Sequence, residues 1–193
     1  MRIAIIIGST RPGRNGLAVA QWVHGIASKR AGVEYELVDI ADYNLPLFDE
    51  PVPPAMGPGS KEHTRRWAAK IASFDGYVFV TPEYNHAPSA ALKNALDFLF
   101  KEWNNKSAGF VGYGGTGAVR SVDMMRMICS NLELADVRAQ VSLTFAADFE
   151  KFTTFKPLPH QEGALGQVLG QVEALLAPLS GSTADPPCSP PSR

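Results

Sequence analysis

The sequence predicts a three-layer α/β sandwich in which helices cover both faces of a five-stranded parallel sheet with strand order 2-1-3-4-5. Short β-branched runs alternate along the chain with longer segments of helical periodicity. The short runs are apolar throughout, which is typical of strands that are buried on both faces of a parallel sheet. Repeated strand–helix units with right-handed crossovers favour this doubly wound order.

The individual elements follow from these patterns in chain order. The expected strands are Ile3–Ile7, Tyr35–Val38, Tyr77–Thr81, Ala108–Gly112 and Val137–Leu143. The expected helices are Asn15–Ala31, which would stop at Gly32, then Ser89–Phe100, Ala118–Leu132 and Leu165–Leu176. The segment Asn44–Ser60 is rich in proline, shows no periodicity and is predicted to be irregular.

Composition points to one globular domain with small molecules as partners. Of 193 residues, 45% are hydrophobic and 19% charged, so residues 1–179 can form one domain, followed by a Pro- and Ser-rich tail, residues 180–193, that is expected to be disordered. A formal net charge of -1 disfavours nucleic acid and anionic membranes as partners. No apolar stretch approaches the roughly 18 residues of a membrane span. Cys129 and Cys188 lie outside any metal or redox spacing, which favours a cytoplasmic location.

The segment after the first expected strand has the residues of a phosphate site. Residues 8–16, GSTRPGRNG, combine hydroxyls, two arginines and the start of a helix. Backbone N–H groups at a helix N-terminus, hydroxyls and guanidinium groups all donate hydrogen bonds to phosphate oxygens. The alternative is a solvated turn whose arginines face water.

Two common nucleotide-binding motifs are incomplete at this segment. Arg14 and Asn15 stand where a P-loop requires Lys followed by Ser or Thr, which disfavours hydrolysis of ATP or GTP. The GxGxxG turn of a Rossmann fold is missing as well. Asp39, at the end of the second expected strand, is therefore expected to be a strand-end cap or loop residue and not a ribose ligand.

Two further segments are expected on the same edge, because ligands of open parallel sheets bind beyond the carboxyl ends of the strands, where the strand order reverses. Residues 81–88, TPEYNHAP, form a rigid polar and aromatic turn that suits a flat ring. Residues 113–117, YGGTG, would let a planar ligand lie on bare main chain, although a tight turn also requires glycines. An anion site beside two platforms matches FMN, a phosphate joined by a ribityl chain to a flat ring.

With these three segments the chain resembles the NADPH-dependent FMN reductase family, whose flavodoxin-like members include quinone, chromate and azo-dye reductases. The resemblance rests on GSTRPGR at residues 8–14, PEYNHAPSAALKNALDFL at 82–99 and YGGTGAVR at 113–120. It implies a flavodoxin-like fold, an FMN cofactor, NADPH or NADH as electron donor, and a homodimer or homotetramer with the flavin near the interface. The sequence departs from the family pattern at Gly16, where a hydroxyl residue is often found, and at Ala118, where many relatives have glycine.

The resemblance also implies roles for individual residues. The phosphate would be held by Ser9, Arg11, Arg14, Asn15 and Gly16, the isoalloxazine would be lined by Pro82, Glu83, Tyr84 and Asn85, and its other edge would touch Gly114, Gly115 and Thr116. No catalytic side chain is assigned, because flavin chemistry asks the protein for positioning, electrostatics and water exclusion. Glu83 as a general acid and His86 as a proton donor stay open, beside a purely structural role in the loop.

The predicted function is an NAD(P)H-dependent reductase that passes electrons through FMN to a small acceptor, such as a quinone, chromate, an azo compound or free flavin. A flavodoxin-type electron carrier and a non-catalytic FMN-binding module are the alternatives; the near-neutral charge favours the enzyme, because such carriers tend to be strongly acidic. Apolar side chains beyond one core-facing stripe suggest helix pairing between subunits, namely Leu96, Phe98, Leu99, Phe100, Trp103, Met124, Met127 and Ile128.

Overall fold

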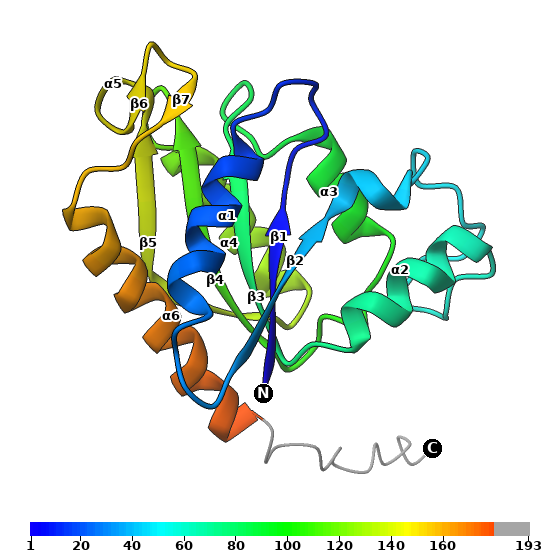
Figure 1. Cartoon of the computed structure of the whole chain (residues 1–193). Helices are drawn as coiled ribbons and strands as arrows, with labels where there is room; N and C mark the ends of the chain where they lie inside the picture. The colour runs from blue at the N-terminus through cyan, green and yellow to red at the C-terminus, as the bar shows by residue number, and fades with distance from the viewer. Residues whose placement is uncertain (180–193) are drawn as a thin grey trace, which may run out of the picture.

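A five-stranded parallel sheet forms the centre of the molecule (Figure 1). The structure is a computed structural model that describes residues 1–179, so the tail for which the sequence predicts disorder lies outside the described residues. The strands are β1 (Arg2–Ile7), β2 (Glu34–Asp39), β3 (Gly76–Pro82), β4 (Ser107–Gly114) and β5 (Ala135–Thr144). Their order is β2-β1-β3-β4-β5 and all neighbours pair in parallel. The predicted topology is confirmed, and each predicted strand lies inside an observed one.

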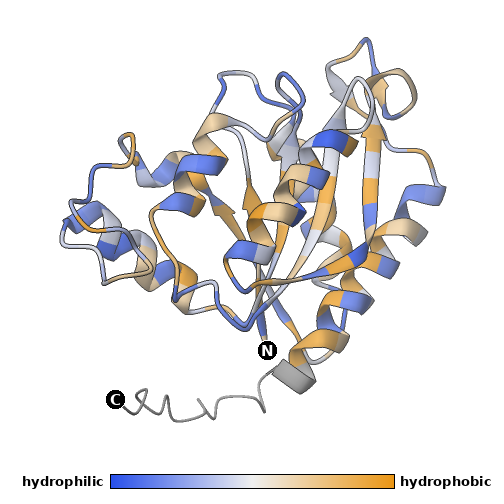
Figure 2. Cartoon of the chain, turned by 180° about the vertical axis from the view of Figure 1, so that it is seen from behind, coloured by the Kyte–Doolittle hydropathy of each residue, from blue (hydrophilic) through white to orange (hydrophobic). Residues whose placement is uncertain are grey.

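Helices cover both faces of this sheet and enclose two hydrophobic cores. Helices α1 (Gly16–Ala27) and α6 (His160–Leu179) pack on one face, and α2 (Glu62–Ala72), α3 (Ala90–Asp97) and α4 (Val119–Asn131) pack on the other, which is turned to the viewer in Figure 2. Strand β1 shows why its sequence is apolar throughout. Ala4 and Ile6 point to the α2–α4 side, whereas Ile3, Ile5 and Ile7 point to the α1–α6 side.

The helices differ from the prediction in bounds and in number: α3 ends at Asp97 and not at Phe100, and α6 spans His160–Leu179 and not only Leu165–Leu176. Helix α1 ends at Ala27 and not at Ala31, because Lys29 and Arg30 donate their N–H groups to carbonyls only three residues back, those of Ile26 (3.3 Å) and Ala27 (3.0 Å), and the chain continues as a turn to Gly32, where φ is +81°. Helix α2 is missing from the predicted elements, although Thr64, Trp67 and Ile71 repeat at helical spacing and are all buried. The 11 residues of α2 complete the crossover between β2 and β3.

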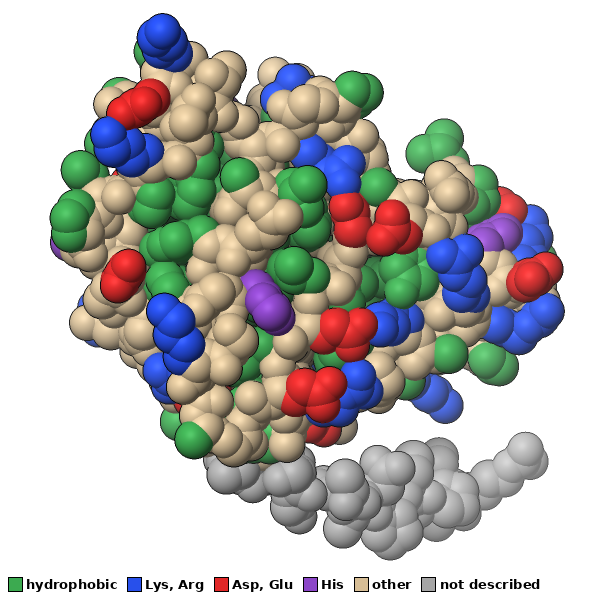
Figure 3. Space-filling view, viewed as in Figure 1, with side chains coloured by type: hydrophobic (Ala, Val, Ile, Leu, Met, Phe, Trp, Pro, Cys, Tyr) green, Lys and Arg blue, Asp and Glu red, His purple; other side chains and the backbone are tan. Residues whose placement is uncertain are grey.

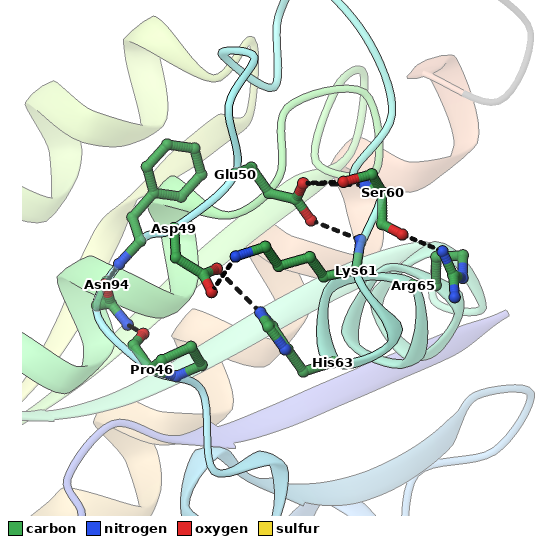
Figure 4. Close-up of polar contacts among 9 residues, drawn as sticks. Pro46, Asp49, Glu50, Ser60, Lys61, His63, Arg65 and Asn94 are labelled. Atoms are coloured by element: carbon green, nitrogen blue, oxygen red, sulfur yellow. Dashed lines mark hydrogen bonds and ion pairs between the residues drawn. The ribbon is translucent and has the colours of Figure 1, made fainter.

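The second part of the predicted irregular segment Asn44–Ser60 is closed by side-chain contacts between its two ends, residues 49–50 and 60–63 (Figure 4). The Glu50 carboxylate accepts hydrogen bonds from the Ser60 N–H (3.0 Å), the Ser60 hydroxyl (2.7 Å) and the Lys61 N–H (2.9 Å). Asp49 pairs with Lys61 at 2.5 Å and with His63 at 3.0 Å. Residues 50–60 therefore form a loop without regular structure whose two ends are held together by the Glu50 carboxylate.

A small antiparallel hairpin follows the edge strand β5 and was not among the predicted elements. It consists of β6 (Phe149–Glu150) and β7 (Thr154–Phe155), preceded by the one-turn helix α5 (Phe145–Asp148). The buried carboxylate of Asp148 anchors it by accepting from the N–H groups of Thr144 (2.8 Å) and Leu158 (3.1 Å). Strands of two residues are too short to produce a sequence periodicity.

The predicted intersubunit surface is wrong for most of its residues. Leu96, Phe98, Leu99 and Trp103 are buried in the core beneath α2 and α3, and Phe100 packs against that core. Helix α3 ends at Asp97, so the side chains that follow it belong to a turn and not to an outer helix face. The apolar side chains of this turn point into the core. On α4, by contrast, Met124 (38% exposed) and Met127 (66% exposed) do face outward.

Charged side chains of opposite sign lie close together on the surface. On the face seen in Figure 3, blue Lys and Arg groups adjoin red Asp and Glu groups in several places. Ion pairs of this kind include Arg30–Glu173 at 2.5 Å and the i,i+4 pair Lys93–Asp97 at 2.6 Å. The surface is thus balanced in charge, in agreement with a formal net charge of -1.

Candidate functional site

The loops that leave β1, β3 and β4 lie on one edge of the sheet, at the top in Figure 1. Because β1 and β3 are neighbours that lead to opposite halves of the sheet, the strand order reverses between them. Gly8 joins the first two loops: its N–H donates to the carbonyl of Val80 (2.9 Å), and its carbonyl accepts from the Ser89 hydroxyl (2.6 Å). A Cβ atom at Gly8 would lie 2.9 Å from the Val80 oxygen, so this close approach requires glycine.

The first loop carries the predicted phosphate residues. Ser9 is fully buried and its hydroxyl lies 3.1 Å from the Tyr84 hydroxyl, while the N–H of Arg11 donates to it at 3.4 Å. Asn15 precedes α1 without capping the helix through its side chain, and Gly16 is the first residue of the helix. The first turn of α1 has no acidic residue, so its N–H groups and positive dipole face the loop uncompensated by a side chain of the helix.

Arg14 in the same loop has two different environments at its guanidinium group. Its Nη2 donates to the carboxylate of Asp39 at the end of β2, whereas its Nε is buried and has no partner among the described residues. Asp39 also accepts from the N–H of Ala41 at 3.0 Å. Asp39 is therefore a strand-end cap, as predicted, and it holds Arg14 in a position where the buried Nε–H is left unpaired.

The second loop presents its residues on a tight hairpin turn. The N–H of Tyr84 donates to the Ala87 carbonyl (2.9 Å) and that of Ala87 to the Tyr84 carbonyl (3.1 Å). Asn85 and His86, the two central residues, have φ of +51° and +68°, which is the requirement of a type I′ turn. Tyr84 is 38% exposed, and Asn85 and His86 are exposed. Pro82 is the last residue of β3 and is buried, so the turn stands on a rigid base.

Glu83 connects the second loop to the third. Its carboxylate accepts from the Arg120 backbone N–H (3.2 Å) and from Arg120 Nε (2.6 Å), close to the N-terminus of α4. Arg120 also donates to the Thr116 hydroxyl at 3.0 Å. Through these contacts Glu83 links the second loop to the third. This is the structural role that the sequence left open beside that of a general acid.

The third loop, Gly114–Gly117, exposes main chain on the same edge. A Cβ atom on Gly115 would meet nothing within 4 Å, and one on Gly114 would have its nearest neighbour at 3.8 Å. Packing therefore does not explain these two glycines. Gly117 is different, because its φ of +70° and a Cβ position 2.8 Å from Ser142 both require glycine.

Two residues missed by the sequence prediction also reach the first loop. The hydroxyl of Tyr113, at the end of β4, lies against Gly16, and the Phe152 carbonyl at the tip of the β6–β7 hairpin accepts from Asn15 Nδ2 at 3.3 Å. The position of Tyr113 directly before two glycines at a strand end was a usable signal. The hairpin gave no comparable signal, because its two-residue strands are too short to show a sequence periodicity.

The first loop fits a phosphate-bearing cofactor. In the described part of the chain, three buried side-chain nitrogen or oxygen atoms lack a hydrogen-bond partner, and two of them, Arg14 Nε and the Tyr113 hydroxyl, border this loop. Both can donate to an anionic oxygen, as can the N-terminus of α1 and the Ser9 hydroxyl. Buried polar atoms are normally paired, so two unpaired ones at one loop point to a ligand.

A groove of about 430 Å³ continues this edge between the second loop and helices α3 and α4. Its lining is mainly apolar and comprises Tyr84, Asn85, Ala87, Pro88, Ala90, Lys93, Met124 and Ile128. Within residues 1–179, no helix is long and apolar enough to cross a membrane. That part of the chain also has no cluster of three or more His, Cys, Asp or Glu side chains placed to hold a metal ion.

The parallel sheet with strand order 2-1-3-4-5 and helices on both faces defines a flavodoxin-like fold. The family model of NADPH-dependent FMN reductase matches residues 1–148, and the chain belongs to this family. It is therefore a flavin-dependent oxidoreductase that works with FMN and NAD(P)H.

Individual relatives and solved structures agree with this assignment. The NAD(P)H-dependent FMN reductase ntnL of Nectria sp is 38% identical over 173 residues, which cover 86% of this chain and 84% of the relative. A 2-hydroxy-1,4-benzoquinone reductase of Burkholderia sp is 30% identical over 142 residues, 69% of this chain and 73% of the relative. Among solved structures, the flavoenzyme NAD(P)H:(acceptor) oxidoreductase FerB of Paracoccus denitrificans superimposes with a TM-score of 0.68 at 18% identity and covers 93% of this chain and 97% of its own.

Proposed function

We propose that this protein holds FMN across the three loops, takes electrons from NADPH or NADH, and passes them to a small flat acceptor such as a quinone. The observation that carries the proposal is the pair of buried, unpaired donors at the first loop, beside two exposed platforms on the same edge. Bound FMN supplies a group that accepts hydride and gives electrons away. The protein supplies position, charge and exclusion of water.

At the phosphate end, the first loop offers donors from four sources. The N-terminus of α1, which begins at Gly16 beside Asn15, points backbone N–H groups at the loop. Ser9 contributes a buried hydroxyl, Arg14 a free Nε, and Arg11 an exposed guanidinium group. Arginine can bind phosphate oxygens with two parallel hydrogen bonds. This set would offer a phosphate monoester several hydrogen-bond donors and the positive charge of Arg11.

At the ring end, the second and third loops provide a rigid surface. Residues Pro82, Glu83, Tyr84 and Asn85 would face one side of the ring, and Gly114, Gly115 and Thr116 would face its other edge. The Glu83–Arg120–Thr116 contacts hold the two loops in a fixed relation. Because its carboxylate is occupied by Arg120, Glu83 serves positioning in this proposal and not proton transfer.

The apolar groove beside Tyr84 suits an acceptor with an aromatic or quinoid ring. The name of the Burkholderia relative, a 2-hydroxy-1,4-benzoquinone reductase, supports this class of acceptor. Chromate, azo compounds and free flavin are the other acceptors that the sequence suggests.

The proposal includes a homodimer, or a tetramer of two such dimers, working in the cytoplasm. Support for the dimer comes from the outer face of α4, where Val119, Met124 and Met127 are 42%, 38% and 66% exposed and Met124 also lines the apolar groove. A second copy placed there would cover these side chains and border the ring. Among residues 1–179, Cys129 is buried, and burial raises the pKa of its thiol to about 12. A buried thiol of this kind does not take part in disulfide exchange, which is compatible with the proposed cytoplasmic location.

The test is the visible spectrum of the purified protein with added FMN, followed without oxygen after addition of NADPH and, separately, NADH. We expect FMN to bind, its absorption bands to bleach with at least one nicotinamide, and 1,4-benzoquinone to restore them. Binding without bleaching would replace the enzyme by an electron carrier or a non-catalytic flavin module. No binding of FMN would overturn the proposed site.

A further inference from the structure

Tyr113 places a hydroxyl group directly beneath the start of helix α1. It is the penultimate residue of β4, packs in the core between the sheet and helices α1 and α6, and is 3% exposed. A Cβ atom on Gly16 would lie 2.6 Å from the hydroxyl oxygen and 3.3 Å from Cζ. The hydroxyl therefore reaches the backbone of the first residue of α1, and glycine at position 16 leaves the room that it needs.

This hydroxyl has no hydrogen-bond partner among the described residues. Burial raises the pKa of Tyr113 and the nearby Tyr84 adds to the rise, whereas the adjacent Ser9 hydroxyl, Arg11 and Arg14 oppose it, so the group remains a protonated donor. The Ser9 hydroxyl is already engaged by the Tyr84 hydroxyl (3.1 Å) and by the Arg11 N–H (3.4 Å). The N–H groups at the start of α1 are donors too, and so is Arg14 Nε, which means that none of them can accept from Tyr113. The missing partner must be an acceptor, and the surrounding donors make it an anion.

We propose that the Tyr113 hydroxyl donates a hydrogen bond to the phosphate of FMN and so helps the site to select FMN over riboflavin. The inference rests on the proposed FMN site and extends it to a residue of β4, outside the loop of residues 8–16. A phosphate monoester has three terminal oxygens, enough to accept from Tyr113 at the sheet side and from the loop and helix on the other side.

The substitution Tyr113→Phe removes this oxygen and nothing else. We expect the affinity for FMN, measured by quenching of flavin fluorescence, to fall about tenfold or more, because hydrogen bonds to charged groups are the stronger ones. The affinity for riboflavin, which has no phosphate, should stay within about twofold. Without flavin, the melting temperature of the variant should equal or exceed that of the original protein, because the deleted hydroxyl has no partner there.

Tyr43→Phe is the matched control, since Tyr43 packs against Trp67 on the opposite face of the sheet. It should leave the affinities for FMN and riboflavin unchanged. Equal losses of FMN and riboflavin affinity in Tyr113→Phe would overturn the inference, as would no loss of either. If the original protein binds neither flavin, the proposed function itself fails, which is a different result from an unselective Tyr113→Phe variant.

Discussion

Glu173 shows how one carboxylate fastens the last described helix to the rest of the fold. It lies on α6 and accepts from Arg30 Nε (2.6 Å), from Arg30 Nη2 (2.5 Å) and from the Tyr35 hydroxyl (2.5 Å). Arg30 belongs to the turn after α1, and Tyr35 to β2. Helix α6 thus meets two neighbouring segments, 143 and 138 residues earlier in the chain, at one side chain that is 18% exposed. Bidentate pairing with arginine makes the contact specific in geometry.

The pH dependence of this cluster can be predicted from the Glu173 side chain. The hydrogen bond from Arg30, partly opposed by burial, lowers the pKa of Glu173 below its usual value. A carboxylate with a lowered folded-state pKa contributes stability above the unfolded pKa of about 4.3, and this is lost as pH falls through the folded-state pKa. We expect Glu173→Gln to lower the free energy of unfolding by about 1 to 2 kcal/mol at pH 7, allowing for the partial exposure of Arg30.

Urea unfolding at pH 7 and at pH 3 measures this effect. The difference between the original protein and Glu173→Gln should shrink at the lower pH, where Glu173 itself begins to take up a proton. A difference that is the same at both pH values would show that the carboxylate charge is not responsible. Lys156→Ala is a suitable control, because its pair with Glu150 is exposed and screened by solvent and is expected to leave the free energy of unfolding unchanged.

At the scale of single elements, helix α3 supports the segment Asn44–Ser60 from below. Asn94 donates from Nδ2 to the Pro46 carbonyl (2.7 Å) and accepts at Oδ1 from the Phe48 N–H (2.9 Å), as Figure 4 shows. A cavity of about 340 Å³ lies between α3 and the start of this segment and includes Thr10 of the first loop. The Asn94 side chain therefore holds the segment Asn44–Ser60, which follows β2, at a fixed distance from α3.

Replacement of this side chain should loosen the segment without unfolding the protein. We expect Asn94→Ala to lose about 1 kcal/mol of stability and to accelerate amide hydrogen exchange at Phe48 and cleavage by protease within residues 47–57. Lys93→Ala, one residue earlier on the same helix, removes only the exposed pair with Asp97 and should change neither readout. Unchanged exchange at Phe48 in Asn94→Ala would mean that other contacts hold the segment.

At the scale of the whole molecule, the sequence was sufficient for the architecture and for the loops but not for the links between the loops. Strands buried on both faces are apolar without alternation, so the sheet could be predicted from residues such as Ile3–Ile7. Ser9 and Arg14 were predicted as phosphate residues from residue type alone, because hydroxyl and guanidinium groups donate hydrogen bonds to phosphate oxygens. The Glu83–Arg120 contact joins residues 37 positions apart and depends on β3 and β4 being neighbours, which a local pattern does not encode.

The face of the sheet to which the Tyr113 side chain points could not be predicted from the neighbouring residues either. Its value as a donor depends on Gly16, which comes close only when the sheet is assembled. The misplaced apolar surface has a similar origin, because a helix prolonged from Asp97 to Phe100 rotates every later side chain to the wrong face. An error of a few residues in the end of a helix therefore changes the predicted direction of the side chains that follow by a large angle, since each helical residue turns by about 100°.

The assembly of the molecule is the remaining prediction at this scale. With a chain of 20.8 kDa, we expect light scattering at micromolar concentration to give the mass of two chains or four. Met127→Asp should shift this mass toward the monomer, because burying an unpaired charge in an apolar interface is costly. Met56→Asp is the matched control, since Met56 is 79% exposed in the segment Asn44–Ser60. A monomer for the original protein would refute the proposed dimer.

The two cores on opposite faces of the sheet divide the three tryptophans of the chain between them. Trp67 and Trp103 are buried on the α2–α4 side with ring centroids 6.3 Å apart, whereas Trp22 packs edge-on against Phe155 of the hairpin, 5.7 Å away, on the α1–α6 side. Intrinsic fluorescence consequently records both faces at once. In a Trp22→Phe variant it becomes a local probe of one face, and the difference from the original spectrum becomes a probe of the hairpin.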